Sequence, residues 1–426
     1  MKIMVIGGGG REHAIIKKLR QSPKITEIYA LPGNGGIAQD AVCTGIGAKD
    51  IPEIVNFAKN NSIDFAVVAP DDPLVLGAVD ELEKIGVPCF GPDKNAAVIE
   101  GSKVFSKDLM KKYGIPTAKY EVFTDMQKAL AYLDTAPIPT VVKADGLALG
   151  KGVIIAATRD EAKGAVRSMM EDKVFGESGS QIVIEEFLEG PEVSVLTFTD
   201  GNTLVPMVSS MDHKRARDND EGLNTGGMGT VAPNPYYTDE IAKECMEKIF
   251  LPTIKAMNAE NRTFKGCLYF GLMLTKDGPK VIEYNCRFGD PETQVVLPLL
   301  ESDLFEIMQA VRNGMLSETE VKFSSGSACC VIMASDGYPE KYEKGFEISL
   351  PSPEPAGTEI YVAGAKLEGG KLLTNGGRVL GVTAKSDDLK SAINKAYEAV
   401  KLVHFKNAFY RTDIGQRALK AFKKEV

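Results

Sequence analysis

The sequence predicts a multidomain protein of mixed α/β and α+β class, and three observations lead to this prediction. The chain has 426 residues, which at about 150 residues per domain corresponds to roughly three folding units. Its composition, 44% hydrophobic and 25% charged, is that of ordinary globular domains. The pattern of strand and helix signals changes twice along the chain. We therefore expect a doubly wound parallel sheet in residues 1–102, an α+β region in residues 103–324 and an α+β domain in residues 325–426.

Strand and helix signals alternate over the first part of the chain. The strands are apolar throughout, which indicates a parallel sheet that is covered by helices on both faces. The first helix carries Ala14, Ile15 and Leu19 at helical spacing. The expected strands are Lys2–Ile6, Glu27–Leu31, Phe65–Ala69 and Pro88–Phe90, and the expected helices are Arg11–Arg20, Pro52–Asn60 and Leu74–Ile85.

Residues 120–188 show a second pattern, in which strands flank one central helix, Arg159–Glu171. The loop between the first two of these strands is rich in glycine, which favours an antiparallel hairpin over a crossover. We expect a small α+β lobe that can move as a lid. Its strands are expected at Thr140–Ala144, Gly152–Ala157 and Gln181–Phe187, followed by strands at Glu192–Thr199, Gly266–Thr275 and Lys280–Tyr284 and a helix at Asp239–Asn258.

The last part of the chain again combines strands with a helix. The helix is predicted to start from an N-cap near Ser386, because apolar side chains from Leu389 to Val403 then share one face. The strands of this C-terminal α+β domain are expected at Ala328–Ala334, Glu359–Val362 and Arg378–Ala384.

Charge and cysteine usage limit the partners of the protein. The formal net charge is -8 and no long run of lysine or arginine occurs, so nucleic acid is not expected as a partner. The seven cysteines include no C-x-x-C pair and the chain has three histidines, which argues against zinc and suits a reducing compartment. No segment has transmembrane length. We expect a soluble, cytoplasmic monomer without membrane attachment.

Two glycine-rich segments are candidates for phosphate binding. The first, Gly7–Gly10, lies between a strand and a helix, where backbone amides can approach an anion. Glu12 stands where the dinucleotide fingerprint has its last glycine, so a single phosphate is favoured over a dinucleotide. A tight turn that binds no ligand is the alternative.

The second segment runs from Lys143 to Gly152 and is not a Walker A loop. Gly146 and Gly150 are one residue too close, and a strand follows instead of a helix. A glycine-rich hairpin with a lysine at each end, here Lys143 and Lys151, can still fold over a triphosphate. An exposed, flexible hairpin is the alternative.

Acidic residues end the last predicted strand of the lobe, Gln181–Phe187. Glu185 and Glu186 precede a hinge at Gly190 and Pro191. Their carboxylates could accept hydrogen bonds from an adenine amino group and ribose hydroxyls. A solvated acidic turn explains the segment equally well.

The densest group of candidate residues lies between Glu283 and Glu292. Glu283 and Asn285 are two residues apart, so a strand places both side chains on one face. Two oxygen ligands on one face suit Mg²⁺, which also binds substrate phosphates. Arg287 shares that face and could clamp a carboxylate or a phosphate. Structural salt bridges would explain one of these charges, but several at the end of an apolar strand are costly to bury.

Two polar stretches, Asp212–Arg215 and Asn224–Gly229, show neither helical nor strand periodicity. Loops of this length inside compact domains are commonly functional, so we expect these to order around a substrate. His213 is expected to be a hydrogen-bonding partner and not a catalytic base.

Taken in chain order, these segments resemble the phosphoribosylamine–glycine ligases (glycinamide ribonucleotide synthetases), a family of the ATP-grasp superfamily. The similarity covers essentially the whole chain. The segments that carry it are Gly7–His13, Pro32–Asn34, Phe90–Pro92, Lys143–Gly146, Ile184–Leu188, Asp212–Arg215, Asn224–Gly229, Arg287–Gln294, Asn375–Val379 and Tyr410–Gly415.

The resemblance implies a central ATP-grasp core with a mobile lid lobe. It implies ATP-dependent joining of glycine to 5-phosphoribosylamine through a glycyl phosphate, giving glycinamide ribonucleotide, ADP and phosphate in purine biosynthesis. ATP and Mg²⁺ or Mn²⁺ are the implied cofactors. The residues that the resemblance implies for ATP binding are Lys103, Lys143, Glu185, Glu186, Phe187, Leu188 and Glu192, and those implied for metal binding are Glu283 and Asn285. The residues implied for phosphoribosylamine binding are Gly9, Arg11, Asn34, Asp71 and Pro73. The residues implied for glycine binding are Lys214, Asn224, Thr225 and Arg287. The implied catalytic residues are Arg287, Lys143, Lys151 and Asp212.

The chain departs from the family pattern at several positions. Gly8 replaces a usual serine, Asp71 a usual glutamate and Pro191 a common acidic residue. Tyr269–Thr275 contains no carboxylate, so a second metal ion would depend on phosphates, waters or residues elsewhere. Two alternatives stay open: a different ATP-grasp carboxylate–amine ligase, and a nucleotide-binding regulator without turnover.

Overall fold

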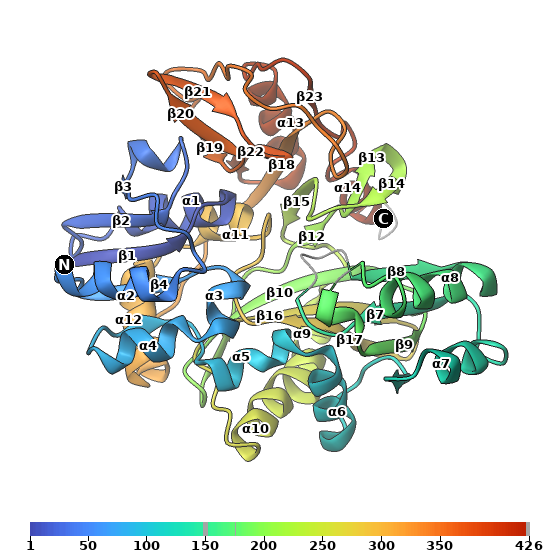
Figure 1. Cartoon of the computed structure of the whole chain (residues 1–426). Helices are drawn as coiled ribbons and strands as arrows, with labels where there is room; N and C mark the ends of the chain where they lie inside the picture. The colour runs from blue at the N-terminus through green and yellow to red at the C-terminus, as the bar shows by residue number, and fades with distance from the viewer. Residues whose placement is uncertain (148–151, 175, 423–426) are drawn as a thin grey trace.

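The structure of the protein, a computed structural model, describes residues 1–147, 152–174 and 176–422. Within these residues the strands form four sheets of four to six strands and two smaller ribbons. Figure 1 shows the N-terminal sheet on one side, the central sheets across the base and the C-terminal domain above them. The chain therefore combines α/β and α+β units, as the sequence predicts.

The N-terminal sheet is parallel, with the strand order β3-β2-β1-β4-β5. Alternate side chains of β1 enter two different cores: Met4 and Ile6 pack on one face, and Ile3 and Val5 on the other. Because both faces are covered, the prediction of a doubly wound sheet is confirmed. Its elements are β1 (Lys2–Gly7), α1 (Gly10–Leu19), β2 (Glu27–Pro32), β3 (Val42–Cys43), α2 (Ile51–Asn60), β4 (Phe65–Val68) and β5 (Cys89–Phe90).

The predicted helix Leu74–Ile85 is wrong as a single element. The structure has two helices there, α3 (Asp71–Leu76) and α4 (Ala78–Lys84). Gly77 between them has a φ of +94°, a left-handed conformation that ends the first helix. The chain then enters the central region through α5 (Lys94–Gly101) and α6 (Lys103–Tyr113).

The lobe of residues 120–188 contains a four-stranded sheet of order β6-β9-β7-β8. β7 and β8 pair antiparallel, which confirms the predicted hairpin. The prediction of one helix is wrong, because α7 packs with α8 in a separate small core around Leu133 and Val166. The elements are β6 (Tyr120–Phe123), α7 (Met126–Leu133), β7 (Thr140–Ala144), β8 (Val153–Ala156), α8 (Arg159–Met170) and β9 (Ile182–Glu186).

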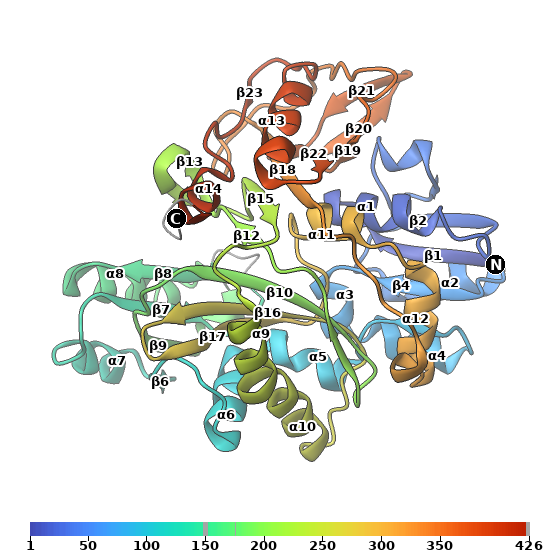
Figure 2. The ribbon, with the colours of Figure 1, turned by 180° about the vertical axis from the view of Figure 1, so that it is seen from behind.

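The central antiparallel sheet has the order β11-β10-β16-β17. The predicted helix Asp239–Asn258 runs without a break through a π-helical turn at Met246–Phe250 (Figure 2). It packs on the sheet through Phe250, whose ring centroid lies 4.3 Å from that of Phe270. The elements are β10 (Glu192–Thr199), β11 (Leu204–Pro206), α9 (Asp239–Cys245), α10 (Leu251–Ala259), β16 (Gly266–Thr275), β17 (Gly278–Asn285), α11 (Thr293–Leu299) and α12 (Leu304–Asn313).

The C-terminal sheet has the order β12-β15-β18-β22-β19, with β23 paired to β18. Two of its strands, β12 and β15, come from residues 211–232, so the chain enters this sheet long before the C-terminal region begins. The other elements are β18 (Ser327–Ser335), β19 (Thr358–Val362), β20 (Ala365–Glu368), β21 (Lys371–Thr374), β22 (Arg378–Ser386), α13 (Leu389–Val400), β23 (Ala408–Phe409) and α14 (Gln416–Phe422).

Two predictions for these parts of the chain are wrong. Residues 212–229 include short strands, β12 (Met211–Asp212), β13 (Arg215–Arg217), β14 (Glu221–Asn224) and β15 (Gly229–Ala232). Strands this short show no periodicity, because two to four residues complete hardly one alternation. The N-cap of α13 is Asp388 and not Ser386, since the Asp388 carboxylate accepts a hydrogen bond from the backbone amide of Ser391.

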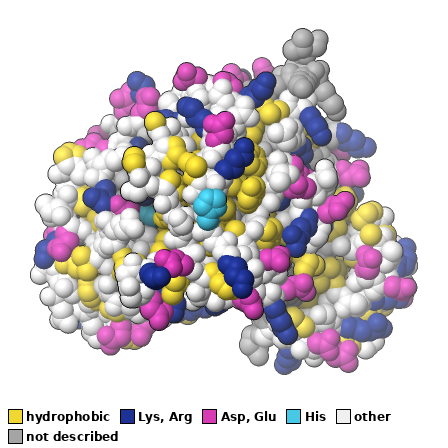
Figure 3. All heavy atoms as spheres, turned by 90° about the horizontal axis from the view of Figure 1, so that it is seen from above, with side chains coloured by type: hydrophobic (Ala, Val, Ile, Leu, Met, Phe, Trp, Pro, Cys, Tyr) yellow, Lys and Arg dark blue, Asp and Glu magenta, His cyan; other side chains and the backbone are white. Residues whose placement is uncertain are grey.

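The distribution of charged side chains on the surface and the length and composition of the helices bear on possible partners. Figure 3 shows basic and acidic side chains interspersed over the face that the C-terminal domain presents. None of the helices in the described ranges combines the length and the apolar composition that crossing a bilayer requires.

Phe305 on α12 offers a test of how the N-terminal sheet is held. Its side chain is fully buried, and its ring meets Phe65 of β4 edge-on at a centroid distance of 5.3 Å. Because Phe305→Ala leaves a cavity, we expect the free energy of unfolding to fall by about 3–5 kcal/mol. The chain lacks tryptophan, so unfolding in guanidinium is best followed by far-UV circular dichroism. Leu367→Ala, at a half-exposed position, is the control and should change stability by about 0.5 kcal/mol. Equal losses in both variants would contradict this packing.

Candidate functional site

A cavity of about 680 Å³ lies between the lobe sheet, the central sheet and the β13–β14 hairpin. The structure brings together on its wall most of the residues that the sequence singled out. These are Asp71, Lys103, Lys143, Glu185, Glu186, Phe187, Leu188, Glu192, Asp212, Lys214, Asn224, Thr225, Glu283, Asn285 and Arg287. Lys151, the second lysine of the predicted phosphate hairpin, lies outside the described residues.

The ends of β16 and β17 position Glu283 and Asn285 at this cavity. Lys214 Nζ lies 3.8 Å from the carboxylate of Glu283 and 3.2 Å from that of Glu192. Burial would raise the pKa of Glu283, but Lys214 and Lys143 outweigh it and hold that pKa below its usual value. Glu192 raises the pKa of Lys214 well above its usual value. Both groups are therefore charged at neutral pH.

The pair Glu283 and Asn285 fits a divalent cation. An ionised carboxylate and an amide oxygen are hard ligands, and Mg²⁺ in nucleotide enzymes is held by few protein ligands together with substrate phosphates. No group of three or more histidine, cysteine or acidic side chains suited to a metal occurs in the described ranges. The pair would hold a metal only together with phosphate oxygens and water.

Arg287 links this edge to the N-terminal region. Its guanidinium lies 2.9 Å from the Glu100 carboxylate and 3.9 Å from that of Asp71, and it donates to Asn285 Oδ1 at 3.3 Å. Its buried Nε has no hydrogen-bond partner within the described residues, so one donor is free for a ligand. Burial raises the pKa of Glu100, and the charge of Arg287 opposes that shift.

Glu100 is a site residue that sequence reasoning missed. It ends the apolar face of a short helix on which Ala96, Ala97 and Ile99 are buried. Its carboxylate also accepts the backbone amide of Cys286 at 2.7 Å. The sequence does carry a signal for Glu100, namely an acidic residue at a position where the helix is otherwise apolar. Such a carboxylate is buried only when a charged or hydrogen-bonding group is paired with it.

Glu185 lies between two lysines. Its carboxylate is 3.0 Å from Lys107 and 3.0 Å from Lys143, and all three side chains are almost completely buried. Burial lowers the pKa of Lys107 to about 8, although Glu185 opposes that shift. Glu185 is therefore not part of a solvated turn, and its carboxylate fixes Lys143 in the cavity. Lys107 is a second residue that the sequence analysis missed.

The N-terminal glycine loop faces a separate cavity of about 960 Å³, which Gly9 and Arg11 line. The amide of Gly9 donates to the Glu12 carboxylate at 2.6 Å, so the helix N-terminus is already capped by its own side chain. Gly8 leaves no room for a serine, because a Cβ would lie 2.4 Å from the carbonyl oxygen of Gly33.

Asn34 and Pro73 line neither cavity. The Asn34 amide donates to the carbonyl oxygens of Gly8 and Val362 and accepts the amides of Gly36 and Ile37. All of its usual hydrogen-bonding capacity is thus used, and the two donated hydrogen bonds tie the glycine loop to β19.

Asp212 and Thr225 belong to the wall formed by β12–β15. Burial and the charge of Glu292 raise the pKa of Asp212 well above its usual value, against the influence of Lys214. Thr225 donates both its amide and its hydroxyl to the carbonyl oxygen of Lys214, each at 2.8 Å. These contacts fix the backbone of Lys214, while its side chain is held by Glu192 and Glu283.

His213 is buried behind this wall. Its Nε2 accepts the amide of Gly415 at 3.2 Å, so Nδ1 carries the proton and donates to the carbonyl oxygen of Gly229 at 3.1 Å. The prediction that His213 is a hydrogen-bonding partner is confirmed.

Two antiparallel sheets face each other across the main cavity, with Lys143 on one and Glu283 and Asn285 of β17 on the other. This arrangement defines an ATP-grasp protein. Models of three parts of one family match the chain: the phosphoribosylglycinamide synthetase N domain over residues 1–100, the ATP-grasp (A) domain over residues 101–293 and the C domain over residues 328–417. The chain belongs to the phosphoribosylglycinamide synthetase family.

Individual relatives agree with this assignment. The phosphoribosylamine–glycine ligase of Caldanaerobacter subterraneus subsp. tengcongensis is 48% identical over 415 residues, which are 97% of this chain and 99% of the relative. The crystal structure of phosphoribosylamine–glycine ligase from Thermotoga maritima is similar with a TM-score of 0.84 at 33% identity, covering 97% of this chain and all of the other. The biotin carboxylase domain of Hydrogenobacter thermophilus 2-oxoglutarate carboxylase, solved with MgADP, shares the fold alone: TM-score 0.73, 16% identity, 96% of this chain and 91% of the other.

The burial of His213 predicts a specific pH dependence of stability. Burial, together with Arg417 and Arg411, lowers its pKa from 6.5 to about 4. Between these values the unfolded chain binds a proton that the folded chain does not, so stability falls as pH falls. We expect His213 to account for a loss of about 3 kcal/mol over this window.

Denaturant unfolding at a series of pH values measures this loss. His213→Gln keeps a polar side chain but cannot titrate, so its free energy of unfolding should fall less steeply from pH 6.5 to 4 than that of the parent. Parallel curves for the two proteins would show that His213 does not titrate as described.

Proposed function

We propose that the protein joins glycine to 5-phosphoribosylamine with ATP, giving glycinamide ribonucleotide, ADP and phosphate. The observation that carries this proposal is the main cavity, where Lys103 and Lys143 lie together with Glu283, Asn285 and Arg287. It is supported by relatives whose names state this ligase activity over nearly the whole chain. The reaction belongs to purine biosynthesis.

Activation of the carboxylate explains the need for ATP. Oxide is a poor leaving group, so the γ-phosphoryl group is transferred to the glycine carboxylate, with ADP leaving and glycyl phosphate forming. The amine nitrogen of phosphoribosylamine then attacks the acyl carbon, phosphate leaves and the nitrogen loses a proton. Positioning and charge neutralisation by Lys143, Lys151 and Arg287 would carry this chemistry, since it needs no covalent enzyme nucleophile.

The two cavities, which both have Asp290 in their lining, suggest how the substrates are distributed. Lys103, Lys143 and the strand end Glu185–Leu188 would hold ATP, together with Glu192. Asp212, Lys214, Asn224, Thr225 and Arg287 would hold glycine. Gly9, Arg11 and Asp71 would bind phosphoribosylamine, while Asn34 and Pro73 would shape that pocket from behind. Glu283 and Asn285 would hold Mg²⁺ or Mn²⁺, which when bound neutralises phosphate charge.

We also propose the division of the chain and its setting. Residues 1–102, 103–324 and 325–426 would be the domains, with residues 120–188 as a lid, in keeping with the ranges that the family models match. A cytoplasmic location fits seven cysteines that are all free. We also propose that the protein is a monomer.

Substrate-dependent release of ADP tests the proposed function. We expect glycine and phosphoribosylamine together to stimulate ADP formation, with glycinamide ribonucleotide as product. Stimulation by a different acid and amine would favour another ATP-grasp ligase. If no combination of acid and amine stimulates ADP formation, the alternative of a nucleotide-binding regulator without turnover is favoured.

Glu283 is the first test of the metal edge. Glu283→Ala should abolish ligation, because the cavity loses its ionised oxygen ligand and Lys214 loses a partner. The steady-state rate at limiting Mg²⁺ is the measurement. Glu244→Ala, on the outer helix α9, is the control and should keep full activity. Parent-like turnover of Glu283→Ala would remove this residue from the metal site.

Arg287 is expected to act through its charge and its free Nε. Arg287→Ala should lower kcat/KM by about a hundredfold or more, since loss of a buried charged hydrogen-bond partner costs several kcal/mol and each 1.36 kcal/mol is tenfold in rate. Arg262→Ala is the control, because Arg262 is a partly exposed arginine that contacts Asn95 and does not line the main cavity. Near-normal kinetics of Arg287→Ala would exclude it from the site.

A further inference from the structure

The β13–β14 hairpin forms part of the cavity wall but has little core of its own. Arg215, Asp220 and Asn224 of this segment line the cavity. All four residues of β14 are exposed, and Leu223 is 50% exposed. A two-stranded hairpin is marginally stable in water by itself. Its conformation must therefore be fixed by contacts from elsewhere.

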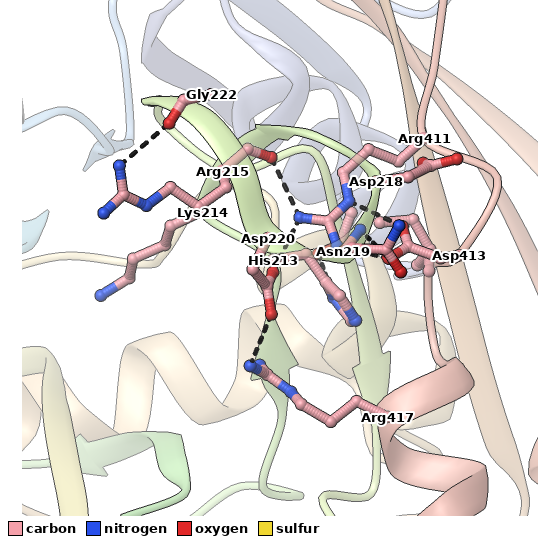
Figure 4. Close-up of polar contacts among 12 residues, drawn as sticks. His213, Lys214, Arg215, Asp218, Asn219, Asp220, Gly222, Arg411, Asp413 and Arg417 are labelled. Atoms are coloured by element: carbon pink, nitrogen blue, oxygen red, sulfur yellow. Dashed lines mark hydrogen bonds and ion pairs between the residues drawn. The ribbon is translucent and has the colours of Figure 1, made fainter. Parts of the chain in front are cut away.

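Arg411, near the C-terminus, supplies the main contacts. Its side chain is 2% exposed, and Nη1 donates to the carbonyl oxygen of Arg215 at 3.0 Å and to Asp220 Oδ1 at 2.9 Å. Nε and Nη2 donate to the two oxygens of Asp413, each at 2.8 Å (Figure 4). One guanidinium thus joins strand β13, the hairpin turn and the C-terminal segment.

The hairpin turn is held at further points. The amide of Thr412 donates to Asp218 at 2.8 Å, and the amide of Asn219 donates to Asp413 at 2.8 Å. Asn219 and Asp220 both have left-handed backbones, with φ of 59° and 57°. Two consecutive residues in this conformation are unfavourable without support, so the turn depends on the segment that holds it.

The same C-terminal segment also holds the base of the hairpin. Gly415 donates its amide to His213, and Arg417 donates to the carbonyl oxygen of Asp212 at 3.4 Å. Figure 4 shows Arg417 reaching Asp220 from the helix below, at 3.1 Å. The segment is itself anchored on α13, because the Tyr397 hydroxyl donates to the Arg411 carbonyl oxygen and accepts the Ile414 amide.

We propose that residues 411–417, which we call the C-terminal clamp, set the position of the substrate residues on the hairpin, with Arg411 as the principal positioning residue. Lys214 lies between His213 and Arg215, both of which the clamp holds, and Thr225 is bonded to Lys214. This proposal rests on the proposed function, in which Lys214, Asn224 and Thr225 bind glycine.

The clamp acts on one end of the cavity. Lys103, Lys143 and Glu185, which would hold ATP, come from α6, β7 and β9 and make none of their described contacts with residues 411–417. A disturbed clamp should therefore weaken glycine binding and leave ATP binding unchanged. A general loss of folding would lower the amount of active protein and leave both KM values as they were.

Arg411→Lys tests the proposal in the full-length protein. Lysine keeps the charge but lacks the planar fork that reaches Arg215, Asp220 and Asp413 together. We expect the KM for glycine to rise at least tenfold and the KM for ATP to stay within twofold of the parent. Amide hydrogen exchange in residues 213–224 should also become faster. The matched control, Arg312→Lys, disturbs an arginine ion pair with Glu83 far from the hairpin and should leave all three measurements unchanged.

A second variant keeps the proposal testable if Arg411→Lys does not fold. Asp218→Ala removes the contacts of the hairpin turn with Thr412 and keeps Arg411 in place, so a smaller increase in the glycine KM is expected. Unchanged glycine KM and exchange rates in both variants would overturn the clamp, provided that the parent protein ligates glycine. A parent protein without ligase activity would instead overturn the proposed function, and exchange in residues 213–224 would still report on the clamp.

Discussion

Lys214 lies between the carboxylates of Glu192 and Glu283, and this ion-pair arrangement decides what the main cavity can do. It holds the pKa of Glu283 below its usual value, whereas burial alone would raise that pKa. The same rule applies to the other buried charges, since each is costly unless a partner is within reach. Two further examples at the main cavity are Arg287 with Glu100 and Asp71, and Glu185 with Lys107 and Lys143.

Each of these pairs joins different parts of the chain. Glu100 belongs to the α5 helix that precedes the central region, whereas Arg287 follows the last strand of the central sheet. Arg378 of β22 likewise pairs with Asp290 at 3.1 Å and donates to the carbonyl oxygen of Gly226. In this structure Arg378 holds two cavity segments together, so the C-terminal domain contributes to the site through support.

Long elements with a complete hydrophobic pattern could be predicted from the sequence. The strands Glu192–Thr199 and Gly266–Thr275 match the structure, because 8 and 10 residues rich in β-branched, aromatic and other apolar side chains give a pattern long enough to recognise. The predicted secondary structure is wrong where a single residue, or a strand far away in the sequence, determines the local conformation. Gly77 divides a helix whose apolar pattern continues past it. β15 is a strand because β18 pairs with it, and β12 is a strand because it pairs with β15. Short segments carry too few residues for a period to emerge.

The sequence by itself determined the chemistry that is available: glycine-rich turns, lysines, and the Glu283, Asn285 and Arg287 spacing on one strand end. These depend on residue type and on local geometry, which neighbouring residues define. Only the tertiary structure decided how that chemistry is used. It assigned Glu185 to two lysines and brought Arg411 to a hairpin almost two hundred residues earlier in the chain. Such contacts join positions that no local pattern relates, because burial and charge pairing act through space.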